Sequence, residues 1–177
     1  MAWDMNDFWV FGYGSLMWNP GFPYQESVQA QIFGYRRSLC IHSHVHRGTP
    51  ENPGLVLGLD RGGSCRGIAF RVSHEDRHEV LAYLRERELV THVYKEKVLS
   101  AVLSDKRQIQ AVSYVADRCH DQYAGMLDHR NAAEIVRNAV GQSGPNLAYV
   151  LNTVSHLREI GIRDHLLEGI GRMAAEC

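Results

Sequence analysis

The alternation of apolar and polar residues predicts strands over about the first 115 residues. In this part, β-branched, aromatic and aliphatic residues form short runs or alternate with polar ones, as is typical of strands bounded by turns. The predicted strands are Trp9–Tyr13, Gln31–His46, Leu55–Leu59, Cys65–Val72, His92–Leu103 and Ile109–Ala116. A helix is predicted from Ser73 to Glu88, because this stretch lacks Gly and Pro and begins with Ser73 and Asp76 at a capping-box spacing.

Helices are predicted in the rest of the chain. They cover Asn131–Val140, Asn146–Ile160 and Arg163–Ala175, and the Gly141–Pro145 segment separates the first two. Strands first and helices last, with one helix inserted, favour an α+β fold over an alternating parallel α/β fold. Because 177 residues is about the length of one domain, we expect a single domain over residues 1–177.

The composition excludes several classes of protein. Hydrophobic residues make up 45% of the chain and charged residues 22%, which is enough for a sizeable core. The net charge is −1, from 19 Lys and Arg against 20 Asp and Glu, so the positive excess of a nucleic-acid binder is absent. No apolar run approaches the roughly 20 residues of a membrane helix. We therefore expect no nucleic-acid or membrane partner.

The ends of the chain and its cysteines indicate a cytoplasmic protein. Met1 to Asp4 includes an acidic residue where a signal peptide carries basic ones. The cysteines, Cys40, Cys65, Cys119 and Cys177, lie far apart without a CxxC pair. This spacing favours neither a zinc ribbon nor a dithiol redox motif, so we expect four reduced thiols.

Glu88 is a candidate for acid–base chemistry because of its place on the predicted helix. It follows Leu81 by seven residues and Leu84 by four, so it lies on their apolar stripe, whereas Glu86 is about 200° from Leu84 and faces solvent. A carboxylate on an apolar face is partly desolvated, which raises its pKa toward the range that suits a proton carrier.

A second interpretation of Glu88 is structural. The helix could fray before this residue, and its carboxylate could then pair at the surface with Arg85 or Arg87. Position along the chain alone favours this interpretation, because ion pairs of neighbouring helical residues are common on protein surfaces.

The segment from Phe11 to Leu16 is a second candidate, because two glycines follow a predicted strand. Such a turn lets a ligand approach the backbone, and its successive N–H groups can hold a carboxylate or phosphate. It is not a dinucleotide fingerprint, since Met17 stands where a third glycine is needed, and no P-loop lysine follows. An ordinary strand-to-loop turn is the alternative.

Three histidines, His42, His44 and His46, form an alternating run among the ten histidines of the chain. In a strand they would point to one side, where two of them could bind a metal. No HExxH motif supports a metal site, and the segment from Arg47 to Pro50 reads as a turn. A polar strand end is the favoured interpretation, and we expect neither a metal nor a cofactor.

Several motifs follow one another in a fixed order along the chain. They are Trp9–Pro20, Gly34–Arg37, His46–Pro50, Pro53–Leu57, Gly67–Val72, Tyr83–Glu88, Ser143–Asn146 and Tyr149. Together these motifs resemble the ChaC-type γ-glutamylcyclotransferase family. The resemblance covers about residues 8–160 and is more specific than any one motif. Two departures are Val45, where the family often has an acidic residue, and the altered segment from Leu89 to Tyr94.

This resemblance implies a small mixed β-barrel with flanking helices and a lyase-type cleavage of glutathione into 5-oxoproline and Cys-Gly. It implies that Glu88 is the catalytic acid/base and that the turn of Tyr13, Gly14, Ser15 and Leu16 holds the γ-glutamyl end through backbone N–H groups. Arg36 or Arg37 is expected to help anchor the substrate carboxylate. Tyr13 and Tyr149 are expected to line and orient the small-molecule substrate.

Other functions remain open at this point. The enzyme could act on other γ-glutamyl amines or γ-glutamyl amino acids, or the chain could be a binding module that keeps only the fold. A metal hydrolase that uses the histidine run is a more distant alternative. Of the oligomeric states, a monomer is favoured.

Overall fold

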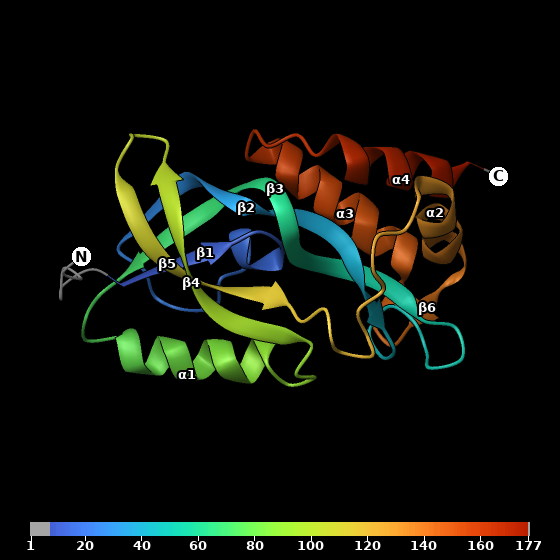
Figure 1. The fold of residues 1–177 in the computed structure, drawn as a ribbon, viewed down its shortest axis with the longest axis horizontal. Coiled ribbons are helices and arrows are strands. Elements are labelled where there is room, and N and C mark those ends of the chain that lie inside the picture. Colours follow the sequence, from blue (N-terminus) through green and yellow to red (C-terminus); the bar gives the residue numbers. More distant parts are fainter. Residues whose placement is uncertain (1–7, 177) are drawn as a thin grey trace. The chain divides into compact units, whose positions relative to one another are not determined.

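The computed structural model describes residues 8–176, in which five strands form a closed barrel (Figure 1). The strands are β1 (Phe8–Gly12), β2 (Glu26–Ser43), β3 (Gly54–Val72), β4 (Tyr94–Leu103) and β5 (Gln108–Ala116). Their order is β1-β3-β2-β4-β5, with a further β3–β5 pairing. The barrel is mixed, because β1 is antiparallel to β3, with Phe8 opposite Val72, and parallel to β5, with Trp9 opposite Ala111.

Within residues 8–176, four α-helices and one short 3₁₀ helix accompany the barrel. They are η1 (Ser15–Met17), α1 (Arg77–Glu88), α2 (His129–Asn138), α3 (Asn146–Glu159) and α4 (His165–Ala175). The last three α-helices pack against one another. The predicted α+β class with a small mixed barrel and flanking helices is thereby confirmed. None of the helices within residues 8–176 is long and apolar enough to cross a membrane.

The chain forms two compact units, each built from two segments. The first unit contains residues up to Arg37 and Leu59–Val115, and the second contains Ser38–Gly58 and the residues from Ala116 onward. Strands β2 and β3 run from one unit into the other. The first unit holds β1, β4, α1 and most of β5, and the second holds α2, α3 and α4. That the whole chain acts as a single domain stays a prediction.

The strand boundaries differ from the predicted ones where glycines lie inside a strand. We predicted two strands on either side of Asp60–Ser64, but β3 is continuous through this stretch. Gly62 and Gly63 have φ angles of +102° and +68°, so they bend the strand without ending it. Strand β2 ends at Ser43, which leaves His44 and His46 beyond it.

The predicted start of the first helix is also corrected. Ser73 Oγ accepts the N–H of Asp76 at 3.2 Å and donates to its carboxylate at 2.8 Å, which closes a turn before the helix. The helix α1 therefore begins at Arg77. In the second unit, the predicted turn at Gly141–Pro145 takes part in a two-stranded ladder of β6 (Val140–Gly141) and β7 (Gly144–Pro145).

Helix α1 is fixed to the barrel by its apolar side. Val80 and Leu84 are buried in a cluster that also contains Val10, Phe70 and Tyr114 of three strands. Burial of side chains of this size contributes roughly 1.5 to 3 kcal/mol each before the entropy cost of folding is counted. The C-terminal end of α1 is therefore held at a defined place on the barrel surface.

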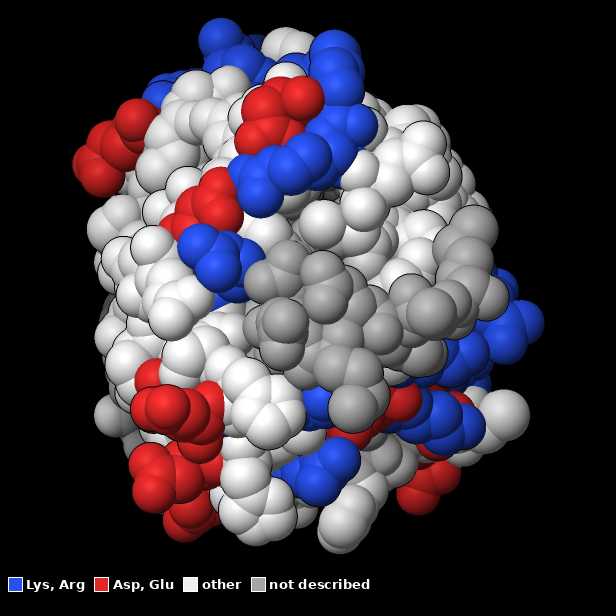
Figure 2. Space-filling model, turned by 90° about the vertical axis from the view of Figure 1, so that its left-hand side faces the viewer, with Lys and Arg blue, Asp and Glu red and all other residues white. Residues whose placement is uncertain are grey.

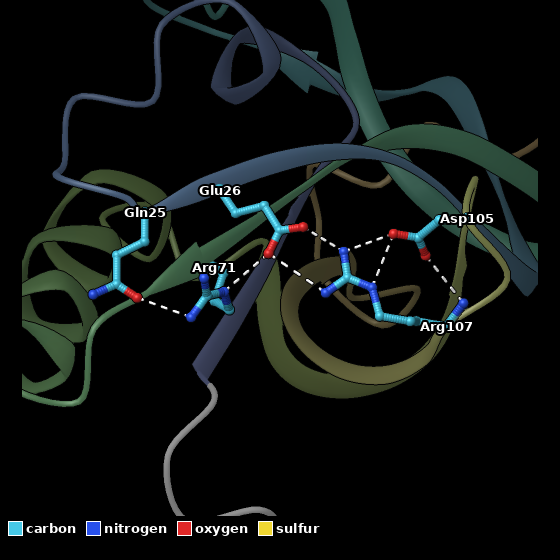
Figure 3. Close-up of polar contacts among 5 residues, drawn as sticks. All are labelled: Gln25, Glu26, Arg71, Asp105 and Arg107. Atoms are coloured by element: carbon cyan, nitrogen blue, oxygen red, sulfur yellow. Dashed lines mark hydrogen bonds and ion pairs between the residues drawn. The ribbon is translucent and has the colours of Figure 1, made fainter.

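Charged side chains of both signs share the surface of the protein. In the view of Figure 2, Lys and Arg lie beside Asp and Glu in the upper part of the face and at its lower right. In the network of Figure 3, Arg107 pairs with both Glu26 and Asp105, and Arg71 donates to Glu26 at 3.0 Å and to Gln25 at 3.0 Å. These pairs neutralise charge locally, which agrees with the net charge of −1.

Of the cysteines that the structure describes, Cys40 and Cys65 are buried and Cys119 is exposed. That the cysteines of the chain are reduced stays a prediction. Cys177, like the segment from Met1 to Asp4, lies outside the described residues.

The side chain of Asn146, in the second unit, forms hydrogen bonds with the backbone of one residue, as a neighbouring strand would. This fully buried side chain accepts the Leu55 N–H at 2.7 Å and donates to the Leu55 carbonyl at 2.8 Å. In Asn146→Ala both backbone groups lose their partner, so we expect the free energy of unfolding to fall by about 2 to 5 kcal/mol. Urea denaturation measures this loss. The exposed Asn52→Ala is the matched control, and an equal effect of both substitutions would contradict the assignment.

Candidate active site

The turn after β1 presents backbone N–H groups at the start of η1. Met17 N donates to the Gly14 carbonyl at 2.9 Å, and Asn19 N donates to the Ser15 carbonyl at 2.8 Å. The N–H groups of Gly14, Ser15 and Leu16 come before the first donor of this short helix and have no hydrogen-bond acceptor within residues 8–176. The turn can therefore offer successive donors to an anion.

Two neighbouring arginines of β2 have different partners, and one of them contacts this turn. Arg37 is buried, and its Nε donates to the Tyr13 carbonyl at 2.6 Å while its Nη2 donates to the Arg66 carbonyl at 2.6 Å. Arg36 pairs with Asp60 at 3.2 Å and also donates to the Arg61 carbonyl. These bonds give Arg37 a role in holding the turn. A direct role of either arginine at a substrate carboxylate stays a prediction.

Glu88 is the last residue of α1 and is partly buried. It lies one and two helical turns after the buried Leu84 and Val80, and its side chain is 19% exposed. Burial raises the pKa of the Glu88 carboxyl, and the positive charge of Arg87, whose Nε lies 3.4 Å from Oε1, opposes that rise. Glu86 is exposed, as predicted from its place on the helix.

Both interpretations of Glu88 describe part of its surroundings. The helix extends to Glu88 without fraying before it, and the carboxylate is partly desolvated. It nevertheless forms an ion pair with Arg87, whereas Arg85 pairs with Glu96.

Arg87 brings the turn and Glu88 to one place. Its Nη2 donates to Ser15 Oγ at 2.9 Å, while its Nε faces the Glu88 carboxylate. The predicted turn and the predicted acid/base, 73 positions apart by the numbers of Ser15 and Glu88, thus share one guanidinium group. This arrangement combines donors for an anion with a carboxylate whose pKa is raised, which suits proton transfer on a small anionic substrate.

A second carboxylate lies next to Tyr114 and was missed by the sequence interpretation. Tyr114 donates to Glu96 Oε2 at 3.1 Å, and Arg85 donates to both Glu96 oxygens at 2.9 Å. The Arg85 hydrogen bonds lower the pKa of Glu96. Burial and the charges of Glu96 and Glu88 raise the pKa of Tyr114 well above its ordinary value, so its hydroxyl stays protonated. Tyr114 is buried together with its neighbours Ser113 and Val115, so no alternation along β5 marked it in the sequence.

Tyr149 lies in the second unit. Its hydroxyl accepts the Leu57 N–H at 3.1 Å, and the Arg47 guanidinium lies 5.5 Å from the centre of its ring. Arg47 also donates to the Ser143 carbonyl at 2.8 Å. The contacts within this unit fix the orientation of the Tyr149 ring, and its role in substrate binding stays a prediction.

The histidine run does not form a common cluster. The Nδ1 atom of His42 is buried without a hydrogen-bond partner in residues 8–176, and burial lowers the pKa of this histidine. His46 Nδ1 lies 3.0 Å from Ser143 Oγ. Within the described part of the chain, no group of three His, Cys, Asp or Glu residues is arranged to hold a metal.

A solved structure of the same fold defines the structural class of this barrel. A γ-glutamylcyclotransferase specific to glutathione from yeast superposes with a TM-score of 0.85 at 23% identity, over 96% of both chains. This likeness concerns the fold alone. The chain matches the family model of ChaC-like proteins over residues 8–176, and it belongs to that family.

Curated relatives are similar to the chain over nearly its whole length. A glutathione-specific γ-glutamylcyclotransferase of Escherichia coli K12 is 32% identical over 177 residues, which is 98% of this chain and 77% of the relative. The glutathione-specific γ-glutamylcyclotransferase 1 of Mus musculus is 34% identical over 173 residues, covering 94% of this chain and 78% of the relative. The predicted family resemblance is confirmed and extends beyond residue 160.

The two carboxylates of this region are expected to titrate in a fixed order. Burial raises the pKa of Glu88, and Arg85 lowers that of Glu96, so Glu96 ionises first as the pH increases. Carboxyl ¹³C NMR titration measures both values, and Glu88→Gln and Glu96→Gln assign the two signals. Titration of Glu96 at a higher pH than Glu88 would contradict the described electrostatics.

Proposed function

We propose that this chain is a γ-glutamylcyclotransferase that degrades glutathione to 5-oxoproline and Cys-Gly. Support comes from relatives named for that activity, at 32% and 34% identity over nearly the whole chain. The observation that carries the mechanism is the partly buried Glu88 carboxylate, which shares Arg87 with Ser15 of the donor-rich turn.

The proposed reaction is an intramolecular ring closure. The α-amine of the substrate attacks its own γ-carbonyl carbon, the new C–N bond closes a five-membered ring, and the amide bond to the cysteine nitrogen breaks. Because nucleophile and electrophile belong to one molecule, the protein contributes chiefly the reactive geometry. No cofactor is required for this step.

Glu88 is proposed to move the proton. Its carboxylate takes a proton from the substrate ammonium, which frees the amine for attack, and the protonated Glu88 then gives this proton to the departing nitrogen. The second proton that the ring nitrogen loses after the attack passes to the released amine, which leaves as an ammonium, so Glu88 ends the cycle as a carboxylate. A raised pKa suits both halves of this cycle, since the group must accept and release the proton near neutral pH.

The turn is proposed to hold the α-carboxylate of the substrate. The N–H groups of Gly14, Ser15 and Leu16 supply the donors, and Arg37 fixes the turn through the Tyr13 carbonyl. Arg36 remains a proposed further anchor. Tyr13 and Tyr149 are proposed as residues that orient the substrate, on the basis of the family resemblance.

The wider setting of the activity is part of the same proposal. We propose a cytoplasmic lyase that acts as a monomer on a small molecule, without nucleic-acid or membrane partners. The wide spacing of the cysteines, without a CxxC pair, supports the proposed compartment.

Replacement of Glu88 by Gln tests the proposed function. Glu88→Gln keeps the size of the side chain but cannot carry the proton, so we expect release of 5-oxoproline from glutathione to fall about 10²- to 10⁴-fold. Glu86→Gln, on the exposed side of the same helix, is the matched control and is expected to retain activity. Release of 5-oxoproline and Cys-Gly is measured by chromatography, and circular dichroism checks the fold.

The same assay separates the alternatives. Full activity of a folded Glu88→Gln protein would contradict the role of Glu88. Turnover of other γ-glutamyl amines without turnover of glutathione would reassign the substrate. A wild-type protein that turns over no γ-glutamyl compound would favour a binding module.

A further inference from the structure

We propose that Arg87 is a positioning residue of the proposed cyclisation, which fixes the Ser15–Pro20 turn against the Glu88 carboxylate. This inference rests on the proposed function and assigns a task to a residue beside the acid/base. Arg87 is mostly buried, with its side chain 21% exposed, and every contact that assigns its task lies within the first unit.

One edge of the guanidinium group contacts the last residues of the Ser15–Pro20 turn. Arg87 Nη1 donates to the Asn19 carbonyl at 2.8 Å and lies 3.2 Å from the Pro20 carbonyl. The same nitrogen donates to the hydroxyl of Tyr83 at 3.1 Å, one helical turn earlier on α1. These carbonyls would otherwise need solvent or another donor, so Arg87 determines where the turn ends.

The other edge holds the start of the turn and faces the carboxylate. Arg87 Nη2 donates to Ser15 Oγ at 2.9 Å, and Nε lies 3.4 Å from Glu88 Oε1. Because a guanidinium group is planar with donors in fixed directions, these contacts set the separation between Ser15 and Glu88. The ammonium group of a lysine is a point charge and cannot make the same set of contacts.

The chain after the turn is shaped to meet this arrangement. Gly21 has a φ angle of +74°, and a Cβ at this position would lie 2.1 Å from the Tyr83 hydroxyl. The backbone therefore passes close to Tyr83, and only glycine fits this conformation and this approach. The Tyr83 hydroxyl also accepts a hydrogen bond from Arg87. Helix α1 therefore contacts this part of the chain through both Tyr83 and Arg87.

Arg87 also sets the charge environment of Glu88. The groups around this carboxylate are Arg87 on its own helix, Ser15 of the turn beyond Arg87, and the neutral Tyr114 of β5, while Glu96 of β4 is neutralised by Arg85. The charge of Arg87 lowers the pKa of Glu88 and opposes the effect of burial. Removal of this charge therefore raises the pKa of Glu88 further.

Two substitutions separate the charge of Arg87 from its geometry. Arg87→Gln removes the charge, so we expect kcat/KM for glutathione to fall about 10- to 100-fold and the acid limb of its pH profile to move to higher pH. Arg87→Lys keeps the charge but loses the fork of donors. We expect it to lower kcat/KM as well, with the acid limb close to that of the wild type. Release of 5-oxoproline is measured from about pH 4 to about pH 9, a range set by protein stability. It gives kcat/KM for glutathione and the position of the acid limb of its pH profile.

Arg77→Gln is the matched control, because Arg77 begins the same helix and lies beside the Phe8 ring. It is expected to leave both kcat/KM and the acid limb unchanged. Wild-type kcat/KM in Arg87→Lys would overturn the geometric part of the proposal, and an unshifted acid limb in a folded Arg87→Gln protein would overturn the electrostatic part.

Failure of the inference is distinguishable from failure of the proposed function. If the wild-type protein releases no 5-oxoproline, the proposed function fails, whatever the variants do. Carboxyl ¹³C NMR of Glu88 then still tests the electrostatic part, because its pKa is expected to rise in Arg87→Gln and to stay close to the wild-type value in Arg87→Lys. If Arg87→Gln does not fold, the kinetic comparison of Arg87→Lys with the wild type decides the geometric part.

Discussion

The candidate site depends on one guanidinium group that joins a turn to a helix end. The turn directly follows strand β1, and Arg87 and Glu88 are the last two residues of α1. Neither element could place these groups alone, since the backbone of a turn needs external partners and a terminal helical residue is prone to fray. The buried side chains of Val80 and Leu84 hold α1 on the barrel, so the contacts of Arg87 are made by a helix whose position is already fixed.

Sequence patterns predicted the partial burial of Glu88 better than they predicted its neighbours. The apolar stripe through Leu84 correctly placed Glu88 on the partly buried side of α1, because helical spacing is a local property. The contacts of Arg87 with Ser15 and of Tyr114 with Glu96 join segments far apart in the chain, and no local periodicity encodes such pairs. The family resemblance predicts the roles of the site residues, and the structure shows which residues surround them.

Glycines were the residues whose local signal misled most about the fold. Gly62 and Gly63 resemble a break between two strands, yet β3 continues through them and bends there. The same residue type at Gly21 accommodates the close approach of Tyr83. Tertiary contacts decide whether a glycine ends a strand, bends it or allows another side chain to approach the backbone closely. The sequence alone cannot distinguish these cases.

Arg85 and Arg87, two arginines of one helix, treat two glutamates differently, and the pKa values of these glutamates shift in opposite directions. Arg85 gives both of its hydrogen bonds to Glu96, at 2.9 Å each, and so keeps that carboxylate ionised. Arg87 divides its donors among the turn, Tyr83 and Glu88, which receives only a 3.4 Å contact, so burial prevails and the pKa of Glu88 rises. Two carboxyl groups whose pKa values are shifted in opposite directions suit different chemical tasks. The way each arginine shares its donors therefore contributes to the opposite pKa shifts of the two glutamates, which supports the proposed role of Glu88 as the proton carrier.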